Sequence, residues 1–316
     1  MGRPSEDWRA ALDEALGVRV TMVIGASDAG KTTLVMTLAG ELAALGARVG
    51  VVDADLGQSE IGPPATVGLG RVSAPIDRLS EATLAALHFV GVTSPGRDLR
   101  GTVEGARRMT ARARADGLER ILVDTSGLVT GWPGRLLKER KIAVLDPDLV
   151  LVLARGDECE PIVRPFEGAT RPRIVRLAAR GSPRSRSQAE RRRHRTAAFD
   201  AYLSDARPVT IDRSAVTVAV PAGRELSECV GALCALDDAQ GDTLAVGVVR
   251  QIAEDALRIL APLEQGGLPP GPPCAPALAP PSQVRGALRD SATLLAGVTA
   301  VRIGWERIDG RRGRRP

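Results

Sequence analysis

The sequence predicts an α/β protein in which a mostly parallel sheet is flanked by helices and followed by a small β-rich domain. Two observations predict this fold class. Strand-like apolar runs alternate with helix-like segments from residue 18 to about residue 205, and this alternation is typical of parallel sheets covered on both faces. Beyond residue 208, short β-like runs are separated by Gly, Pro and Asp turns, which favours a domain of short strands.

The expected elements follow the chain in order. The predicted helices are 5–16, 31–45 (ended by Gly46), 80–88, 102–115, 135–145 and 158–168. The predicted strands of the main domain are 18–24, 48–53, 89–92, 121–124, 149–153 and 173–177. The first two strands and the helix between them form a βαβ unit, which requires parallel pairing. In the β-rich domain, strands are expected at 216–220, 244–249, 257–260 and 298–303.

These patterns give the expected domain boundaries. An N-terminal helix occupies residues 1–17, the main domain 18–207 with an arginine-rich lid at 180–203, and the β-rich domain 208–310. Residues 262–281 hold eight prolines and are expected to form a surface loop. Residues 311–316 form a basic tail.

The composition limits the classes of function. The 316 residues include only three Phe, three Trp and one Tyr, which argues against nucleic-acid surfaces built on rows of stacking aromatics. Only Lys31, Lys138 and Lys141 are lysine among 43 basic residues. Forty arginines together with abundant Ala and Gly are typical of a GC-rich genome, so part of the +5 net charge reflects coding bias and not nucleic-acid binding. The four cysteines form no CxxC pair, so the sequence suggests neither a zinc ribbon nor a redox motif. With no long apolar run and no leader-like N-terminus, a cytoplasmic protein without membrane contact is expected.

A phosphate-binding loop lies between the first strand and the next helix. Residues 25–32 (GASDAGKT) fit G-x-x-x-x-G-K-[ST] in the required strand–loop–helix context. The glycines let the backbone approach a phosphate, and the helix N-terminus favours an anion. The sequence therefore predicts a P-loop NTPase fold that binds ATP with Mg²⁺. The expected nucleotide-binding residues are Gly25, Ala26, Ser27, Asp28, Ala29, Gly30, Lys31, Thr32 and Thr33.

Three carboxylates follow strands that should end beside this loop. Asp53 ends one strand and Asp55 follows it by two residues, while Asp124 ends another strand; the carboxyl ends of parallel strands line the ligand crevice. Together with the Thr32 hydroxyl they are the expected metal site, and which acid organises Mg²⁺ and which accepts a proton stays open. The chain has no N-K-x-D guanine-specificity motif, which disfavours GTP.

An arginine run precedes the predicted β-rich domain. Seven arginines fall between residues 180 and 195, and Arg191 and Arg195 share a helix face. Such a segment is suited to a lid that supplies charge to a transferring phosphoryl group or to a clamp on a polyanionic substrate. It is also compatible with an ordinary solvated basic helix.

Seven stretches of the chain together carry a resemblance to one known family: GASDAGKTTL (25–34), VVDADLGQSEIGPPATVGLG (51–70), HFVGVTSP (88–95), VDTSGLVTG (123–131), LKERKIAVLDPDLVLVL (137–153), SRSQAERRRHRTAAFDAYL (185–203) and GALCALDDAQGDTLAVGVVRQI (231–252). They resemble the P-loop polynucleotide 5′-hydroxyl kinases, which include a eukaryotic pre-mRNA cleavage-factor subunit and the pre-rRNA-processing kinase. The resemblance implies a phosphotransferase that moves the γ-phosphate of ATP to the 5′-OH end of RNA or DNA.

The resemblance also implies residue roles. Lys31 and Thr32 hold the phosphates and Mg²⁺, Asp55 acts as base or metal organiser, and Gln58 contacts nucleic acid or the metal shell. Thr125 and Gly127 match a T-x-G clasp, and Arg191 and Arg195 match an R-x-x-x-R lid.

The sequence departs from the family pattern at two positions. Leu128 stands where eukaryotic members often have a base-stacking Trp, for which Trp132 is the candidate substitute, and Asp124 stands where many members have Asn.

Two other functions compete with this one. A P-loop kinase of a small metabolite would share the Asp55 base without needing a long basic groove. An ATP-binding assembly module would keep the nucleotide without transferring phosphate. The sequence names no protein partner.

Overall fold

A seven-stranded sheet forms the centre of the first of two units in the computed structural model, which describes residues 6–179, 187–262 and 297–308. The first unit extends to Tyr202 and the second begins at Leu203, whereas the sequence placed the boundary after residue 207. The predicted tail at 311–316, and the predicted proline-rich loop from residue 263 onward, lie outside the described residues.

The sheet of the first unit is parallel except at one edge. Its strands, in the spatial order β4-β3-β2-β5-β1-β6-β7, are β4 (Thr83–Phe89), β3 (Thr66–Val72), β2 (Val49–Ala54), β5 (Arg120–Thr125), β1 (Val20–Gly25), β6 (Leu149–Ala154) and β7 (Arg173–Ala178). The pairings from β2 to β7 are parallel, while β3 pairs antiparallel with both β2 and β4. The predicted P-loop α/β fold class is confirmed, with an antiparallel edge that the sequence did not predict.

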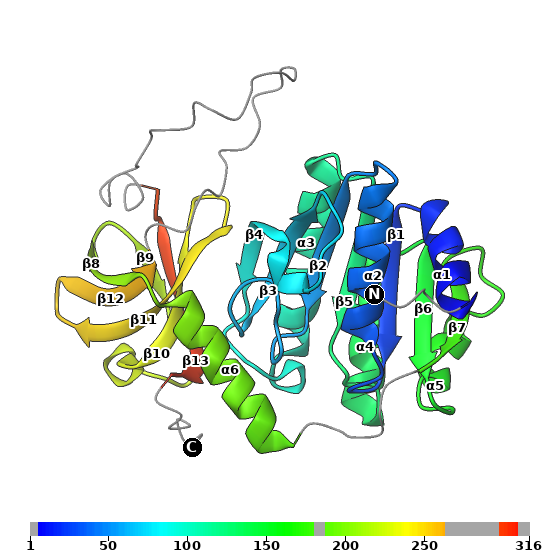
Figure 1. Cartoon of the computed structure of the whole chain (residues 1–316). Coiled ribbons are helices and arrows are strands. Elements are labelled where there is room, and N and C mark those ends of the chain that lie inside the picture. Colours follow the sequence, from blue (N-terminus) through cyan, green and yellow to red (C-terminus); the bar gives the residue numbers. More distant parts are fainter. Residues whose placement is uncertain (1–5, 180–186, 263–296, 309–316) are drawn as a thin grey trace, which may run out of the picture. The chain divides into compact units, whose positions relative to one another are not determined.

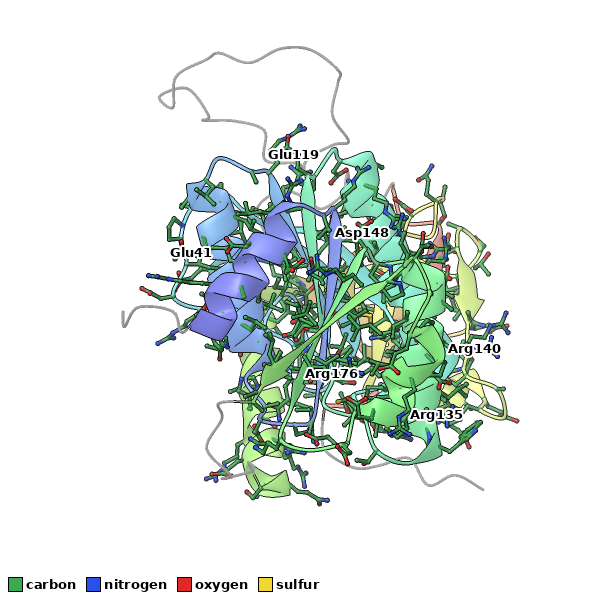
Figure 2. All side chains as sticks on the ribbon, turned by 90° about the vertical axis from the view of Figure 1, so that its right-hand side faces the viewer. Glu41, Glu119, Arg135, Arg140, Asp148 and Arg176 are labelled. Atoms are coloured by element: carbon green, nitrogen blue, oxygen red, sulfur yellow. The ribbon has the colours of Figure 1, made fainter. Side chains whose placement is uncertain are left out.

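Helices cover both faces of this sheet. The helices that pack around the sheet are α1 (Glu6–Leu16), α2 (Lys31–Ala44), α3 (Leu99–Ala115), α4 (Gly131–Leu145) and the one-turn α5 (Glu160–Val163), and the last helix of this unit is α6 (Gln188–Tyr202). Helices α1 and α2 contact each other on one face, and α3 and α4 contact each other on the other (Figure 1). Figure 2 views the unit from the β7 edge, where charged side chains such as Glu41 and Arg140 lie on the outside. In the described residues, no helix has the length and apolar character needed to span a bilayer.

Two predicted helices are wrong. Residues 80–88 form a short 3-10 turn, η1 (Leu79–Glu81), followed by strand β4. The Ala-rich sequence favours a helix locally, but pairing with β3 buries the last five residues of β4, and this tertiary context overrides the local propensity. The helix expected at 158–168 is only α5 followed by the 3-10 turn η3 (Arg164–Phe166).

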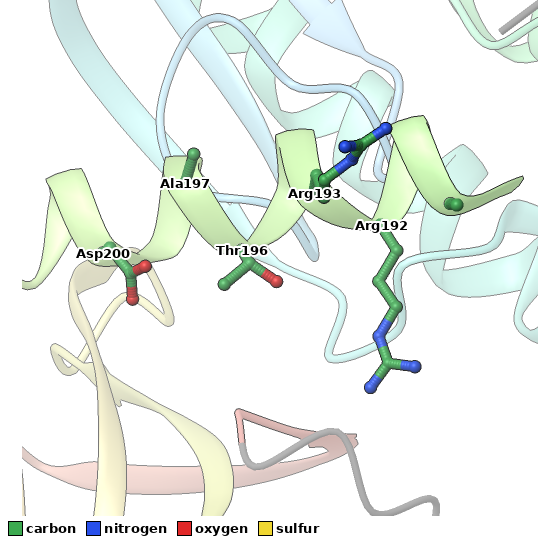
Figure 3. A pocket seen from close by; sticks show the side chains of 6 residues that line it. Arg192, Arg193, Thr196, Ala197 and Asp200 are labelled. Atoms are coloured by element: carbon green, nitrogen blue, oxygen red, sulfur yellow. The ribbon is translucent and has the colours of Figure 1, made fainter. Parts of the chain in front are cut away.

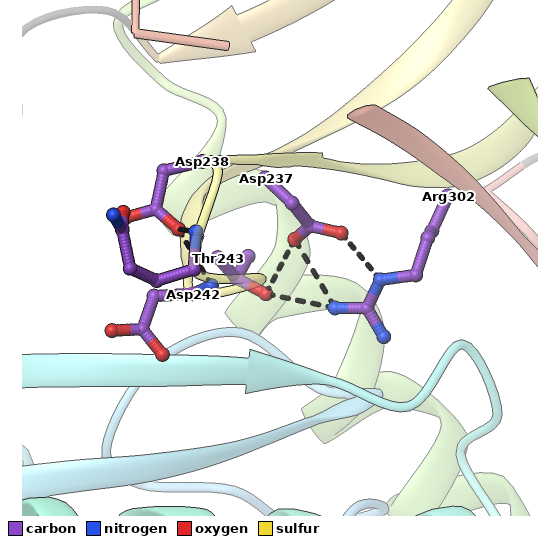
Figure 4. Close-up of polar contacts among 6 residues, drawn as sticks. Asp237, Asp238, Asp242, Thr243 and Arg302 are labelled. Atoms are coloured by element: carbon purple, nitrogen blue, oxygen red, sulfur yellow. Dashed lines mark hydrogen bonds and ion pairs between the residues drawn. The ribbon is translucent and has the colours of Figure 1, made fainter. Parts of the chain in front are cut away.

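The second unit is a six-stranded sheet in the order β8-β12-β11-β10-β13-β9. Its strands are β8 (Ala206–Asp212), β12 (Ala256–Pro262), β11 (Thr243–Ile252), β10 (Ala232–Asp237), β13 (Ala300–Arg307) and β9 (Thr217–Ala219). The buried Asp237 carboxylate accepts hydrogen bonds from Arg302 of β13 and from the Thr243 hydroxyl of β11 (Figure 4). One buried carboxylate therefore ties three neighbouring strands together.

Asp148 fixes the start of β1, the strand that leads into the predicted phosphate-binding loop. Its Oδ2 atom accepts hydrogen bonds from the backbone N–H groups of Arg19 (3.1 Å) and Val20 (2.8 Å). Since these donors would lose their partner, Asp148→Ala is expected to lower the free energy of unfolding by about 1–3 kcal/mol. Urea denaturation measures the change. Asp13→Ala, at an exposed position on α1, is the control and should match the wild type; equal stability of both variants would contradict the prediction.

Candidate active site

The predicted phosphate-binding loop connects the end of β1 to the start of α2. Gly30 caps α2 with a φ of +94°, a left-handed conformation that favours glycine. A Cβ on Gly25 would stand 2.4 Å from the Leu153 carbonyl oxygen of β6, so this position also needs glycine. The Lys31 ammonium folds over the loop and donates to the Ala26 carbonyl oxygen at 2.8 Å. The loop therefore has the backbone shape of a phosphate cradle, with the lysine inside it.

Thr32 and Asp124 form a second part of the site. The Thr32 hydroxyl donates to Asp124 Oδ2 at 2.6 Å. Asp124 is buried, and its Oδ1 atom accepts no hydrogen bond from any described residue. Burial raises the pKa of Asp124, while the charge of Lys31 and the bond from Thr32 lower it. A buried carboxylate oxygen that no described residue donates to, beside a threonine hydroxyl, fits the oxygen ligands that Mg²⁺ takes at P-loops.

Asp53 holds the following loop in place. Its Oδ1 accepts from the Asp55 N–H at 3.1 Å, and its Oδ2 accepts from Glu60 N–H at 2.7 Å, Ile61 N–H at 3.0 Å and the Ser59 hydroxyl at 3.2 Å. Burial and the nearby Asp124 charge raise the pKa of Asp53 to about 7. With four donors inside its own loop, Asp53 is better suited to loop support than to the predicted metal role.

Asp55 and Gln58 lie on that loop. Asp55 Oδ1 accepts from the backbone N–H groups of Gly57 (3.0 Å) and Gln58 (3.2 Å), and both Asp55 and Gln58 are half-buried. Since β2 and β5 are paired in parallel with Asp53 opposite Asp124, Asp55 follows at the same edge of the sheet. The predicted base candidate thus lies beside the candidate metal site.

The predicted clasp packs directly on the phosphate-binding loop. A Cβ on Gly127 would lie 2.5 Å from both the N and Cα atoms of Ser27, so the two backbones are in close contact. The Thr125 hydroxyl donates to the Val23 carbonyl oxygen of β1 at 2.8 Å. Trp132, at the start of α4, is 71% exposed. The clasp therefore supports the shape of the loop, while Trp132 is open to a ligand.

Helix α6 carries the predicted lid arginines. Arg191 Nη2 lies 3.5 Å from Asp28 Oδ2 of the phosphate-binding loop, and His194 Nε2 lies 3.9 Å from Glu60 Oε1. Arg195 follows one turn later and is half-buried. A surface pocket lies along α6, where Arg192, Thr196 and Asp200 project from one side (Figure 3). Residues 180–186 of the predicted lid lie outside the described residues.

Three residues of the site were not predicted. Arg155, which follows β6, donates to the Asp28 carbonyl oxygen at 2.9 Å. Its position shortly after a predicted strand was the sequence feature from which it could have been predicted as a site residue. Lys138 and Lys141 of α4 are fully buried against the same region. Burial lowers the pKa of Lys141 to about 8 and that of Lys138 well below its ordinary value. The rarity of lysine in this chain was a signal for both.

A family model described as "mRNA cleavage and polyadenylation factor CLP1 P-loop" matches residues 25–205. This range begins at the first glycine of the phosphate-binding loop and includes the three carboxylates, the clasp and α6. The chain belongs to the CLP1 P-loop family. The resemblance predicted from the sequence is therefore confirmed at the level of the family.

Curated relatives of this CLP1-family chain come from archaea. It is 36% identical over 197 residues to the polyribonucleotide 5′-hydroxyl-kinase PH0197 of Pyrococcus horikoshii, covering 62% of this chain and 53% of that protein. It is 33% identical over 197 residues to the polyribonucleotide 5′-hydroxyl-kinase MJ1315 of Methanocaldococcus jannaschii, covering 62% and 54%. The match spans about half the length of these relatives.

A solved structure shares the fold of this CLP1-family chain over more of its length than the curated relatives match in sequence. The structure described as the wild-type Clp1p–Pcf11p (454–563) complex matches with a TM-score of 0.65 at 15% identity, covering 96% of this chain and 80% of that one. At this identity the likeness shows the fold alone. It extends beyond the P-loop domain to most of the chain.

Proposed function

We propose that this chain is an ATP-dependent kinase of RNA 5′-hydroxyl ends that works with Mg²⁺. The observation that carries the proposal is the contact of Thr32 with Asp124, whose second carboxylate oxygen is buried and accepts no hydrogen bond from the described residues, next to the Asp55 loop. Relatives named polyribonucleotide 5′-hydroxyl-kinases support RNA as the acceptor. Transfer to 5′-hydroxyl ends of DNA is measured separately, with DNA oligonucleotides in the same assay.

Each residue of the site has its own role in the proposed reaction. Lys31 binds the β- and γ-phosphates, and Thr32 and Asp124 would hold Mg²⁺, which when bound would neutralise phosphate charge. Asp55 accepts the proton of the attacking 5′-hydroxyl. A bond forms between the 5′-oxygen and the γ-phosphorus while the bond from that phosphorus to ADP breaks. Arg191, beside the phosphate-binding loop, and Arg195 supply positive charge to the transferring group.

The decisive experiment supplies the full chain with γ-labelled ATP, Mg²⁺ and 5′-hydroxyl oligonucleotides of RNA and DNA. Label on the 5′ end of RNA, removable by a phosphatase and absent when the oligonucleotide already carries a 5′-phosphate, is the expected result. ATP binding without transfer to any oligonucleotide would overturn the proposal and favour an assembly module. Label in a metabolite mixture but not on oligonucleotides would favour a small-molecule kinase.

Trp132 is expected to stack on a base near the 5′ end. It is 71% exposed at the N-terminus of α4, four residues after Leu128. Because base–aromatic stacking is worth about 1–3 kcal/mol, Trp132→Ala should raise the KM for RNA roughly tenfold and leave the KM for ATP unchanged.

Steady-state kinetics with each substrate varied in turn measure this effect. Trp132→Phe, which keeps an aromatic face, is the matched control and should retain most of the affinity. Equal KM values for RNA in the alanine variant and the wild type would exclude a stacking role.

A further inference from the structure

The three lysines of the chain all lie at the site. Among 43 basic residues only Lys31, Lys138 and Lys141 are lysine, and their exposed fractions are 7%, 0% and 0%. Lysine is almost never fully buried without a partner, because removing its charge from water is costly. Lys31 belongs to the phosphate-binding loop, but the motif does not account for the other two.

Lys138 and Lys141 project from one face of α4. They are three residues apart, and the buried side of this helix is otherwise made of apolar residues and one glycine: Gly134, Leu137, Ile142 and Leu145. An apolar side chain at either position would continue that buried face without the cost of an ammonium group. Packing therefore does not explain why lysine stands at positions 138 and 141.

Each of the two lysine side chains donates a hydrogen bond to a backbone carbonyl oxygen at the end of a strand. Lys138 Nζ donates to the Ser126 carbonyl oxygen at 2.6 Å and contacts its hydroxyl at 3.3 Å. Ser126 lies between the two clasp residues, Thr125 and Gly127. Lys141 Nζ donates to the Ala54 carbonyl oxygen at 3.4 Å.

Ala54 occupies a similar place on the neighbouring strand. It is the last residue of β2 and lies between Asp53 and Asp55. Strands β2 and β5 are paired, with Ala54 opposite Thr125. The two lysines thus hold adjacent strand ends at the edge of the sheet that carries the site.

Their charges also face the acidic side chains of the site. Lys141 interacts with Asp55, Asp53 and Asp124, and Lys138 interacts with Asp55 and Asp124. Lys138 is in turn repelled by Lys141 and Lys31. In a buried environment, positive charge near these carboxylates offsets their mutual repulsion.

We propose that Lys138 and Lys141 are positioning residues of the active site, which fix the clasp and the Asp55 loop through the carbonyl groups of Ser126 and Ala54. This inference rests on the proposed kinase function for its kinetic consequence. Neither lysine contacts the substrate; each acts by holding a strand end that carries residues which do. A small displacement of such residues is enough to slow transfer greatly.

The test compares Lys138→Met and Lys141→Met with Arg140→Met, which removes a cation from the exposed side of the same helix (Figure 2). We expect kcat for RNA phosphorylation to fall by about tenfold to a hundredfold in each lysine variant. The KM for ATP should change by less than about threefold, because Lys31 and its loop remain. Arg140→Met should match the wild type.

A second measurement does not depend on kinase activity. Amide hydrogen exchange of the full chain should become faster at residues 124–128 in Lys138→Met and at residues 53–61 in Lys141→Met, with no change in Arg140→Met. If the variants show this exchange pattern but the wild-type protein phosphorylates no RNA, the proposed function is overturned and the positioning role is still supported.

Two results would overturn the inference. One is kcat equal to that of Arg140→Met together with unchanged exchange at both strand ends. The other is a loss of activity that follows only the fraction of folded protein. If a methionine variant does not fold, Lys138→Gln and Lys141→Gln, which keep a donor for the carbonyl groups, are judged by the same two measurements.

Discussion

Lys31→Met is expected to lower kcat/KM for phosphate transfer by about a thousandfold or more, a loss of about 4 kcal/mol of transition-state stabilisation. The Lys31 side chain is buried inside the phosphate-binding loop, where its ammonium donates to the Ala26 carbonyl oxygen. Methionine keeps the length and apolar stem of the side chain but removes the charge that binds the β- and γ-phosphates. Transfer from γ-labelled ATP to a 5′-hydroxyl RNA measures the effect.

Two further variants make the Lys31 result specific. Lys31→Arg keeps the charge, but its planar guanidinium is larger than the ammonium that the loop encloses, so activity should remain low. Glu41→Ala, at an exposed position on the same helix α2, should match the wild type. Activity of Lys31→Met within tenfold of the wild type would contradict a phosphate-binding role for Lys31.

Gly127→Ala is expected to weaken binding of Mg²⁺–ATP and to lower kcat/KM by roughly a hundredfold. The added Cβ would lie 2.5 Å from the N and Cα atoms of Ser27 and 2.3 Å from its hydroxyl oxygen. Because the nearest atoms include backbone, the clasp or the phosphate-binding loop has to move, and a displacement of about 1 Å at such a site costs on the order of a hundredfold in rate. Calorimetry with ADP and the transfer assay measure the two effects.

Gly96→Ala is the matched control for this substitution. A Cβ there would meet only Leu128 Cδ2 at 3.8 Å, an ordinary van der Waals contact, although Leu128 adjoins the clasp. This variant should bind nucleotide like the wild type. If Gly127→Ala binds as tightly as Gly96→Ala, the close contact between clasp and loop does not shape the nucleotide site.

The predicted and observed elements agree where local pattern and tertiary context favour the same structure. The βαβ unit around the phosphate-binding loop is one example, with its helix predicted at 31–45 and observed at Lys31–Ala44. At 80–88 they disagree, because β4 is stabilised by pairing with β3, a strand that the sequence did not predict. Strands β8 and β10 of the second unit were missed as well.

The residues of the candidate active site likewise fall into those that a local motif predicts and those that depend on tertiary contacts. The motif identified Lys31 and Thr32, but spacing left three acidic residues as equal candidates for the metal. The contacts separate them: Asp53 accepts four hydrogen bonds from its own loop, whereas Asp124 accepts the Thr32 hydroxyl and keeps one oxygen without a described donor. Such differences depend on residues brought together from distant parts of the chain, which spacing does not encode.

The fold class, the phosphate-binding loop and the family resemblance are predicted from the sequence alone, because each depends on short-range periodicity or on a contiguous motif. The folded chain was needed to show which acid lies against Thr32, that Gly127 packs on Ser27, and that Lys138 and Lys141 are buried behind the strand ends. These features were not predictable because the packing of α4 and the pairing of β2 and β5 set burial and hydrogen-bond partners. A lysine in the sequence carries no sign of whether its charge will face water or a carbonyl group.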